Sequence, residues 1–156
     1  SIRIIFSATY NMHKYKNIRS VSRGIYIKEG KVLLAKSKGK CNYHLPGGGI
    51  ERGESARNAL IREIKEEINK DAIIIRFIGV IENHWEENDN SYFETNYLFI
   101  INFEDNHDFT SNEDKLIFQL IDIAKLAEVK ILPEIMNSVL GVSNQDENSA
   151  FWFSNF

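Results

Sequence analysis

The chain has 156 residues, of which 43% are hydrophobic and 26% charged, and 19 basic against 22 acidic residues give a net charge of −3. This length suits one domain with a sizeable core, and the composition is typical of a globular protein rather than a disordered one. The mild negative charge argues against a surface for a nucleic-acid polymer, so a polyanionic ligand would need local cations. No run approaches the roughly 18 apolar residues of a membrane span.

The single cysteine, Cys41, has no partner for an internal disulfide, which favours a reducing compartment. Ser1–Tyr10 lacks the long apolar core of a signal peptide. We therefore expect a cytoplasmic protein with no membrane association. No base is evident near Cys41, so an incidental thiol is favoured over a nucleophile.

The start of the chain is compatible with two roles. Residues 1–17 are first β-prone and then polar, which fits an added edge strand or an arm on a partner subunit. Val21–Lys28 and Lys31–Lys36 are rich in strand-forming residues, and Glu29-Gly30 between them is typical of a turn. We predict a hairpin that leads into the glycine-rich segment Leu45–Gly49, whose backbone can approach a ligand closely.

A helix is predicted shortly after this segment. Ser55 is a good N-cap, and Asn69 tolerates the left-handed conformation that ends a helix. Glu63, Glu66 and Glu67 are spaced i, i+3 and i+4, so one face carries three carboxylates. The neighbouring face is apolar and can lie against a sheet; it consists of Leu60, Ile61, Ile64 and Ile68.

The three carboxylates should repel one another, since like charges at this spacing cost about 0.2–0.5 kcal/mol per pair. A bound cation would offset that cost. Because the donors are all oxygens, Mg²⁺ or Mn²⁺ fits better than zinc. The alternative is a solvated acidic face with no ligand.

The second half predicts more strands and a last helix. The predicted strands are Ala72–Glu82, Tyr92–Phe103 and Lys115–Leu120, with loops at Asn83–Ser91 and Glu104–Asp114, a turn-helix at Ile121–Leu126, and a helix from Pro133 that stops at Gly141. The order predicts an α+β fold, a mixed sheet between helices in one domain over 1–156. The tail 142–156 ends in the aromatic stretch Phe151–Phe156, which we predict packs on this domain or its twin. With the N-terminal arm, it favours a homodimer.

The segment from Gly48 to Lys70 resembles the Nudix box, G-x5-E-x7-R-E-U-x-E-E-x-G-U, where U is aliphatic. Seven of the nine specified positions agree: Gly48, Glu54, Arg62, Glu63, Ile64, Glu66 and Glu67. The last two differ, because Asn69 replaces glycine and Lys70 replaces an aliphatic residue. Tyr43-His44-Leu45-Pro46 resembles the usual lead-in to the box.

The resemblance implies an α/β/α sandwich and a metal site. In such a site Glu63, Glu66 and Glu67 would hold Mg²⁺ or Mn²⁺, and the Gly47 carbonyl would add a ligand. Arg62 and Glu54 would orient the helix, and Glu63 or a loop acid would act as general base. A further carboxylate often comes from outside the box. Our candidate is Glu113, with Glu94 second, against the alternative of solvated or strand-edge acids.

Three residues near the predicted mouth of the site, Arg23, Lys36 and Tyr43, are candidates to contact phosphate or base, with ordinary surface or packing as the alternative. His44 and His84 lack paired ligand spacing, which favours structural roles. The resemblance implies an Mg²⁺-dependent pyrophosphohydrolase acting on a nucleoside diphosphate linked to another group. The alternative is a catalytically silent nucleotide-binding module. The leaving group stays open, and loops such as Asn83–Ser91 and Glu104–Asp114 are expected to select it.

Overall fold

The computed structural model describes residues 17–142 and 149–155. Almost all of the predicted N-terminal arm, and residues 143–148 and 156 of the tail, lie outside this part of the chain. The strands are β1 (Asn17–Ile25), β2 (Ile27–Lys28), β3 (Lys31–Ser37), β4 (Asn42–Tyr43), β5 (Gly47–Gly49), β6 (Ala72–Glu87), β7 (Asn90–Phe103), β8 (Leu116–Asp122), β9 (Lys130–Ile131) and β10 (Phe151–Ser154). The helices are α1 (Ala56–Ile68), the 3₁₀ helix η1 (Ile123–Glu128) and α2 (Met136–Val142).

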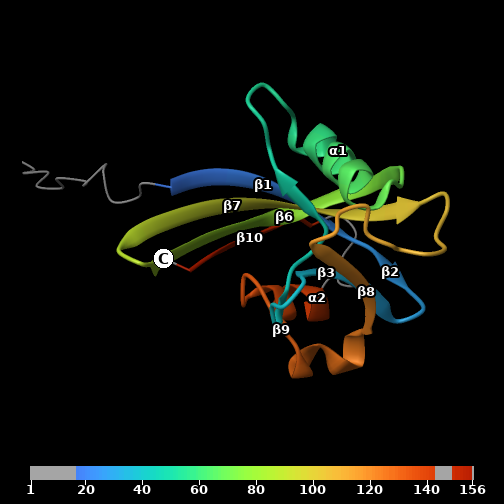
Figure 1. The fold of residues 1–156 in the computed structure, drawn as a ribbon. Coiled ribbons are helices and arrows are strands. Elements are labelled where there is room, and N and C mark those ends of the chain that lie inside the picture. Colours follow the sequence, from blue (N-terminus) through green and yellow to red (C-terminus); the bar gives the residue numbers. More distant parts are fainter. Residues whose placement is uncertain (1–16, 143–148, 156) are drawn as a thin grey trace, which may run out of the picture.

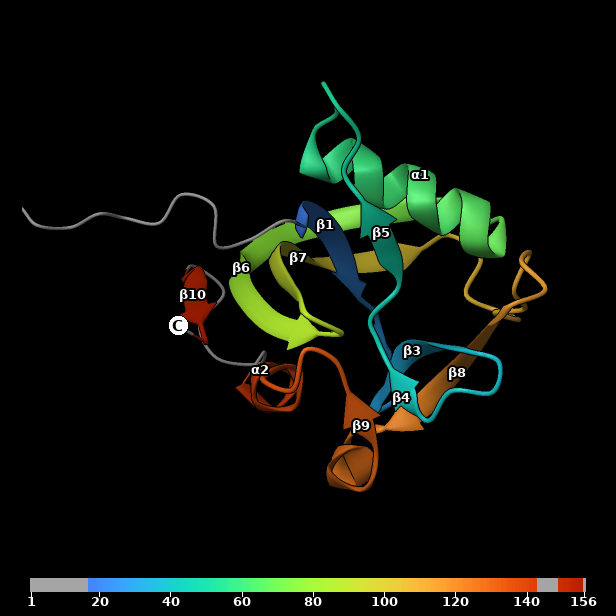
Figure 2. The same cartoon turned by 60° about the vertical axis from the view of Figure 1, so that its left-hand side comes forward.

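The main sheet has five strands in the order β10-β6-β7-β1-β5 and is mixed. β6 pairs antiparallel with β7 and parallel with β10, whereas β1 pairs parallel with β7 and antiparallel with β5. Figures 1 and 2 show α1 on one face of this sheet and α2 on the other. The smaller β2-β3-β8 sheet lies beside the main sheet, and its strand β3 contributes Leu33 to the core with α1 and Leu34 to the core with α2. The α+β sandwich with a mixed sheet is therefore confirmed. Within the described residues no helix is long and apolar enough to cross a membrane.

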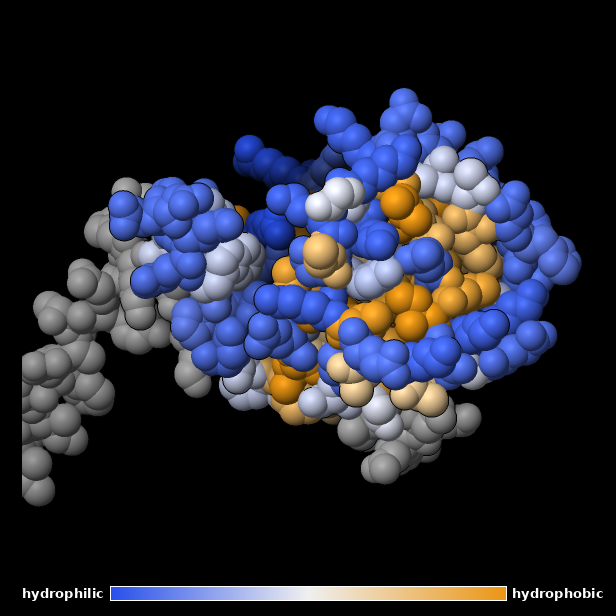
Figure 3. Space-filling view, turned by 60° about the horizontal axis from the view of Figure 1, so that its bottom comes forward, coloured by the Kyte–Doolittle hydropathy of each residue, from blue (hydrophilic) through white to orange (hydrophobic). Residues whose placement is uncertain are grey.

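Two apolar cores hold these layers together. Between α1 and the main sheet, the buried stripe of α1 (Leu60, Ile64 and Ile68) packs with Phe99 and Ile101 of β7. The core on the other face joins the main sheet to α2 and β9, and includes Ile25, Leu98, Ile131, Met136 and Val139. Figure 3 shows the molecule from the α2 and η1 side, where hydrophobic residues gather in the middle and hydrophilic ones surround them. The acidic edge of α1 thus belongs to a helix whose apolar stripe is packed on the main sheet.

The predicted loop Asn83–Ser91 is wrong, because this segment is the end of a long hairpin. β6 continues to Glu87, and only Asn88 and Asp89 form the turn, both with positive φ (50° and 60°). Asn and Asp tolerate these angles, which a two-residue hairpin turn requires. The hairpin end projects beyond the body of the fold (Figure 1), so its strands are polar and lack the apolar alternation that marks a half-buried strand.

The C-terminal region corrects both ends of the predicted last helix and decides one alternative. α2 spans Met136–Val142, so it begins after Pro133, which lies in the turn before it, and it includes Gly141 rather than stopping there. The aromatic tail packs on this domain: β10 pairs with β6 in the register Phe151↔Gly79 to Ser154↔Glu82. Gly79 makes this possible, because its φ is 156° and a Cβ there would lie 2.3 Å from the carbonyl oxygen of Phe151.

Candidate active site

The acidic face of α1 lies against the glycine-rich strand β5. Ser55 caps the helix by accepting from the Asn58 N–H, and Asn69 ends it in the left-handed region, as predicted. β5 pairs with β1 and lies next to α1, which brings Gly48 against Glu63. A Cβ on Gly48 would lie 2.4 Å from the Glu63 carboxyl carbon, so only glycine leaves room for this carboxylate.

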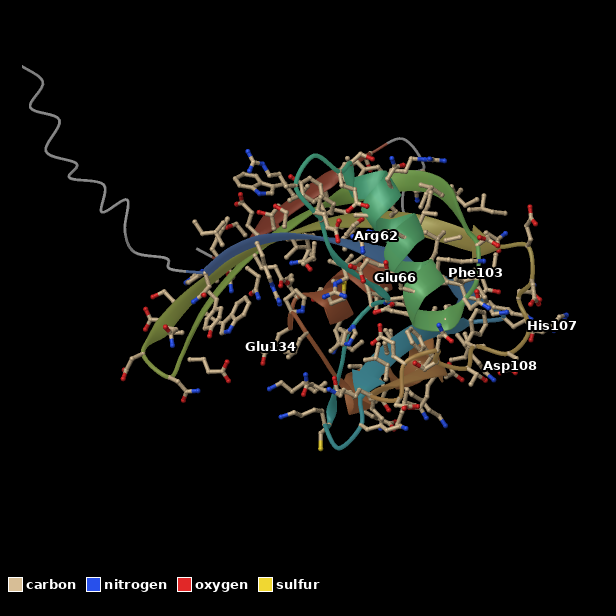
Figure 4. The ribbon with its side chains drawn as sticks, turned by 45° about the horizontal axis from the view of Figure 1, so that its top comes forward. Arg62, Glu66, Phe103, His107, Asp108 and Glu134 are labelled. Carbon is tan, nitrogen blue, oxygen red and sulfur yellow. The ribbon has the colours of Figure 1, made fainter. Side chains whose placement is uncertain are left out.

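Arg62 ties the loop before the helix to the acidic face. Its guanidinium forms a bidentate pair with Glu54 (both contacts 2.9 Å) and also binds Glu63 at 3.0 Å and Glu66 at 3.3 Å. Its Nη2 donates as well to the Gly49 carbonyl. The hydrogen bond from Arg62 lowers the pKa of Glu54, and the Arg62 pKa is raised in return. The orienting role predicted for Arg62 and Glu54 therefore has a geometric basis; Figure 4 shows Arg62 and Glu66 on α1.

Glu67 is the buried acid of the set. Only 6% of it is exposed, and one oxygen accepts the Gly47 N–H at 3.2 Å. Burial raises its pKa to about 7, and the charges of Glu63 and Glu113 act in the same direction, against the Gly47 N–H and Arg23. A cation bound nearby would favour the charged form of this carboxyl group and so oppose the shift.

Arg23 links the acidic helix to the cavity beside it. Its Nη1 donates to the carbonyls of Leu45 (3.1 Å) and Gly47 (2.5 Å), while Nε and Nη2 bond to no described residue. Burial lowers the pKa of Arg23, and the negative charges of Glu94 and Glu67 oppose that shift. The guanidinium therefore lies between the acids of α1 and Glu94 of β7, and its Nε and Nη2 groups have no hydrogen-bond acceptor among the described residues.

A cavity of about 620 Å³ opens beside Arg23 on the face of the main sheet opposite α1. Its volume is within the range of small-molecule sites. The lining comes from β1, β6, β7, β10 and the segment before α2; it includes Arg19, Asn83, Trp85, Glu94, Asn96, Glu134, Phe153 and Asn155. Figure 4 shows Glu134, which lines the cavity, apart from Arg62 and Glu66 of α1, and neither of these two residues lines it.

The loop after β7 brings the predicted outside acid to the helix. Asn112 binds the C-terminal end of α1, its N–H donating to the Glu67 carbonyl at 2.6 Å and its Nδ2 to the Glu66 carbonyl at 3.3 Å. This places Glu113 close enough to influence the pKa of Glu67. Lys70, the divergent last position of the box, is buried and anchors the same loop through the Asp105 carboxylate and the carbonyls of Asp105 and His107.

The remaining predicted residues lie in several places. Lys36 and Tyr43 do not line the cavity; Lys36 lies 5.0 Å from the Tyr43 ring centroid, and the Tyr43 hydroxyl donates to Gln119. His44 does line the cavity, where burial and then Arg23 lower its pKa. Glu94 is not solvated: it is buried, lines the cavity and is paired with Arg19.

Sequence reasoning missed the polar residues of the cavity, above all Arg19, Asn83 and Asn96. One signal was available. In the aromatic run of β7, Glu94 and Asn96 are polar residues two apart, which places both on one face of a strand. Polar residues on one face of an otherwise apolar central strand indicate a built site rather than solvent.

The metal-ligand set predicted from the sequence is Gly47, Glu63, Glu66, Glu67 and Glu113. Within residues 17–142 and 149–155 no three acidic, histidine or cysteine side chains converge closely enough to hold an ion as they stand. Arg62 occupies Glu63 and Glu66, and Glu67 is bound to the Gly47 N–H. The donor chemistry nevertheless fits a hard cation, since oxygens alone are offered and Glu67 is electrostatically coupled to Glu63 and Glu113. The ligand set remains a prediction.

Comparison with known proteins gives a consistent result. A family model described as the NUDIX domain matches residues 18–138. The chain is 50% identical over 48 residues to an RNA pyrophosphohydrolase of Campylobacter jejuni subsp. doylei, and 42% identical over 60 residues to an ADP-ribose pyrophosphatase of Methanocaldococcus jannaschii. These matches cover 30% and 36% of this chain and 31% and 36% of the relatives, so the chain spans about a third of their length.

Solved structures resemble the whole fold. An ADP-ribose pyrophosphatase from Streptococcus suis superposes with a TM-score of 0.67 at 16% identity, over 86% of this chain and 98% of that one. A UDP-X diphosphatase gives 0.64 at 18% identity, over 89% and 68%. At these identities the likeness concerns the fold alone.

Proposed function

We propose an enzymatic function for this chain, which belongs to the NUDIX domain family. The proposed function is that of an Mg²⁺- or Mn²⁺-dependent pyrophosphohydrolase that cleaves a nucleoside diphosphate linked to another group. One observation carries the proposal: buried Glu67 and its neighbour Glu63 lie beside a glycine strand, and Arg23 connects them to a nucleotide-sized cavity. The names of the relatives, pyrophosphohydrolase and ADP-ribose pyrophosphatase, support the reaction class.

The acids of α1 would hold the cation. Glu63, Glu66 and Glu67 supply carboxylate oxygens, the Gly47 carbonyl has a second lone pair beside its bond to Arg23, and Glu113 can join from the loop. Bound there, a divalent cation supplies charge neutralisation for the phosphates and a water of lowered pKa.

The protein's own groups have distinct tasks in this proposal. The free N–H groups of Arg23 bind a phosphate oxygen and orient the diphosphate between the acids and the cavity. Arg62 holds Glu63 and Glu66 in place through its pair with Glu54. Of Glu63 and the loop acid Glu113, the one that does not hold the cation is the candidate to accept the proton of the attacking water.

The test is a panel of nucleoside diphosphate derivatives assayed with Mg²⁺ for monophosphate release. Glu67→Gln should leave folding intact and reduce turnover by orders of magnitude, about 10²-fold or more. Glu128→Gln, at an exposed position on η1, is the matched control and should keep full activity. Equal turnover of Glu67→Gln and wild type at saturating Mg²⁺ would remove Glu67 from the mechanism. Binding without turnover across the panel would indicate a silent nucleotide-binding module.

Location and assembly are also proposals. The exposed free thiol of Cys41 supports a reducing, cytoplasmic setting. Trp152 is 68% exposed on β10 and Phe77 42% exposed on β6, which supports a homodimer, and light scattering would measure its mass.

A further inference from the structure

The floor of the cavity carries an acceptor that the fold does not use. Asn96 on β7 is fully buried (0% exposed) and lines the cavity, and its Oδ1 accepts no hydrogen bond from any described residue. Buried carbonyl oxygens in folded proteins almost always have a partner, because leaving one unpaired is costly. This oxygen therefore lacks the partner that an N–H donor of a ligand pressed against Asn96 would supply.

The orientation of Asn96 is set by its neighbour Glu94. Asn96 Nδ2 donates to Glu94 Oε1 at 3.0 Å, and the other oxygen of Glu94 accepts from Arg19 Nε. An ion-paired carboxylate accepts hydrogen bonds but donates none, so the amide nitrogen must face it. Turning the amide over would set two oxygens against each other. Glu94 thus determines that Asn96 presents its oxygen, not its nitrogen, to a ligand.

The surroundings favour an amino group over a ring imide. The Glu94 carboxylate lies next to Asn96, and it repels a ligand carbonyl placed beside it. The ring N–H of uracil or hypoxanthine is flanked by at least one carbonyl oxygen. The exocyclic amino groups of adenine, cytosine and guanine extend beyond the ring and bring two N–H donors.

The same cavity is suited to the rest of a nucleoside. Trp85 and Phe153 supply aromatic surface to its walls, and bases stack on aromatic side chains. Arg23 lines the cavity and lies within electrostatic reach of both Glu94 and Glu67. Arg23 therefore lies between a base bound near Asn96 and the acids of the helix.

We propose that this cavity holds the nucleobase of the substrate, that Asn96 Oδ1 accepts a hydrogen bond from an exocyclic amino group of that base, and that Glu94 is the residue that positions Asn96. The inference rests on the nucleoside diphosphate substrate proposed above and narrows it to amino-bearing bases. Asn96 is then a specificity residue, whereas Glu94 acts through it.

The experiment measures binding of nucleoside 5′-monophosphates to the full chain by calorimetry, without metal and without turnover. AMP is compared with purine riboside 5′-monophosphate, which lacks only the amino group, and with IMP, which has a carbonyl in its place. AMP should bind about tenfold tighter than either, the effect of one buried hydrogen bond. Equal affinity for the three nucleotides overturns the inference.

Three variants assign the effect to named atoms. Asn96→Leu removes the acceptor at similar volume and should bring the three affinities together. Glu94→Gln can donate to Asn96 Oδ1, so the amide is free to turn over and the preference for AMP should fall. Asn102→Leu makes the same change at an exposed position of β7 outside the cavity and should keep the full preference. A preference that survives Asn96→Leu overturns the inference; if that variant does not fold, the wild-type series still decides.

The binding assay also separates this inference from the proposed reaction. Preference for AMP without cleavage of any nucleoside diphosphate derivative would support base recognition and overturn the pyrophosphohydrolase proposal. Cleavage with no preference among the three monophosphates would support the pyrophosphohydrolase proposal and overturn the inference about base recognition.

Discussion

Replacing Glu67 by glutamine should stabilise the metal-free protein at alkaline pH. Glu67 is 6% exposed, and burial raises its pKa from 4.5 to about 7. In the unfolded chain this carboxyl has its ordinary pKa. Between pH 4.5 and 7 the folded state therefore holds a proton that the unfolded state has released, and the free energy of unfolding falls as pH rises through this window.

The magnitude follows from the width of the window. From 4.5 to about 7 is two and a half pH units, and at about 1.4 kcal/mol per unit the buried charge costs about 3 kcal/mol above pH 7. Glutamine has a similar volume and carries no charge, and its oxygen can still accept the Gly47 N–H. We expect Glu67→Gln to be more stable than wild type by up to about 3 kcal/mol at pH 8, and to differ little near pH 4.5.

Urea unfolding at pH 5 and pH 8 in the presence of a chelator measures this difference. Glu128→Gln is the control, because its carboxyl is exposed and its removal should not change the pH profile. Added Mg²⁺ or Mn²⁺ should recover much of the wild-type stability at pH 8, because a bound cation favours the ionised carboxyl, and should stabilise Glu67→Gln less. Parallel stability profiles of wild type and Glu67→Gln would refute the buried-acid reasoning.

Three further substitutions test the parts around this acid. Gly48→Ala places a Cβ 2.4 Å from the flexible Glu63 carboxylate, so turnover should fall about tenfold or more with little loss of stability. The control Gly49→Ala meets nothing within 4 Å and should change neither quantity. Kinetics and thermal melts compare the two variants, and equal turnover would contradict the argument that a Cβ at Gly48 displaces Glu63. Arg62→Met removes the bidentate partner of Glu54 and should lower both the stability and kcat, the latter about tenfold or more. The control Arg57→Met, at an exposed position of the same helix, should change neither quantity. If Arg62→Met had the same stability in urea and the same kcat as Arg57→Met, Arg62 would have no orienting role. Lys70→Met removes the ammonium that binds Asp105 and the His107 carbonyl, so the loop carrying Glu113 should loosen. Amide hydrogen exchange over 105–114 should then be faster. The control Lys65→Met, which removes an exposed pair with Asp71, should show no such change.

The sequence by itself determined the elements whose physics is local. The helix after the glycine segment is fixed by its cap at Ser55, its apolar stripe and the tolerance of Asn69 for a left-handed end, all of which act within a few residues. The pairing of Arg62 with Glu54 and Glu66 was predictable for the same reason. The hairpin end near Asn88 was missed, because strands that project into solvent lose the alternation from which strands are recognised.

Only the tertiary structure decided what the chain places around the acidic helix. Glu94 and Asn96 on β7, Arg23 on β1 and Phe153 on β10 are separated by tens of residues, and strand pairing brings them to one cavity. Burial decided how each acid behaves. The carboxyl group of Glu128 is exposed to solvent, whereas burial raises the pKa of Glu67 to about 7, because the free energy of a charge depends on the groups packed around it. Sequence spacing specifies which residues share a face of one element, whereas the environment of each charge depends on contacts between elements far apart in the chain.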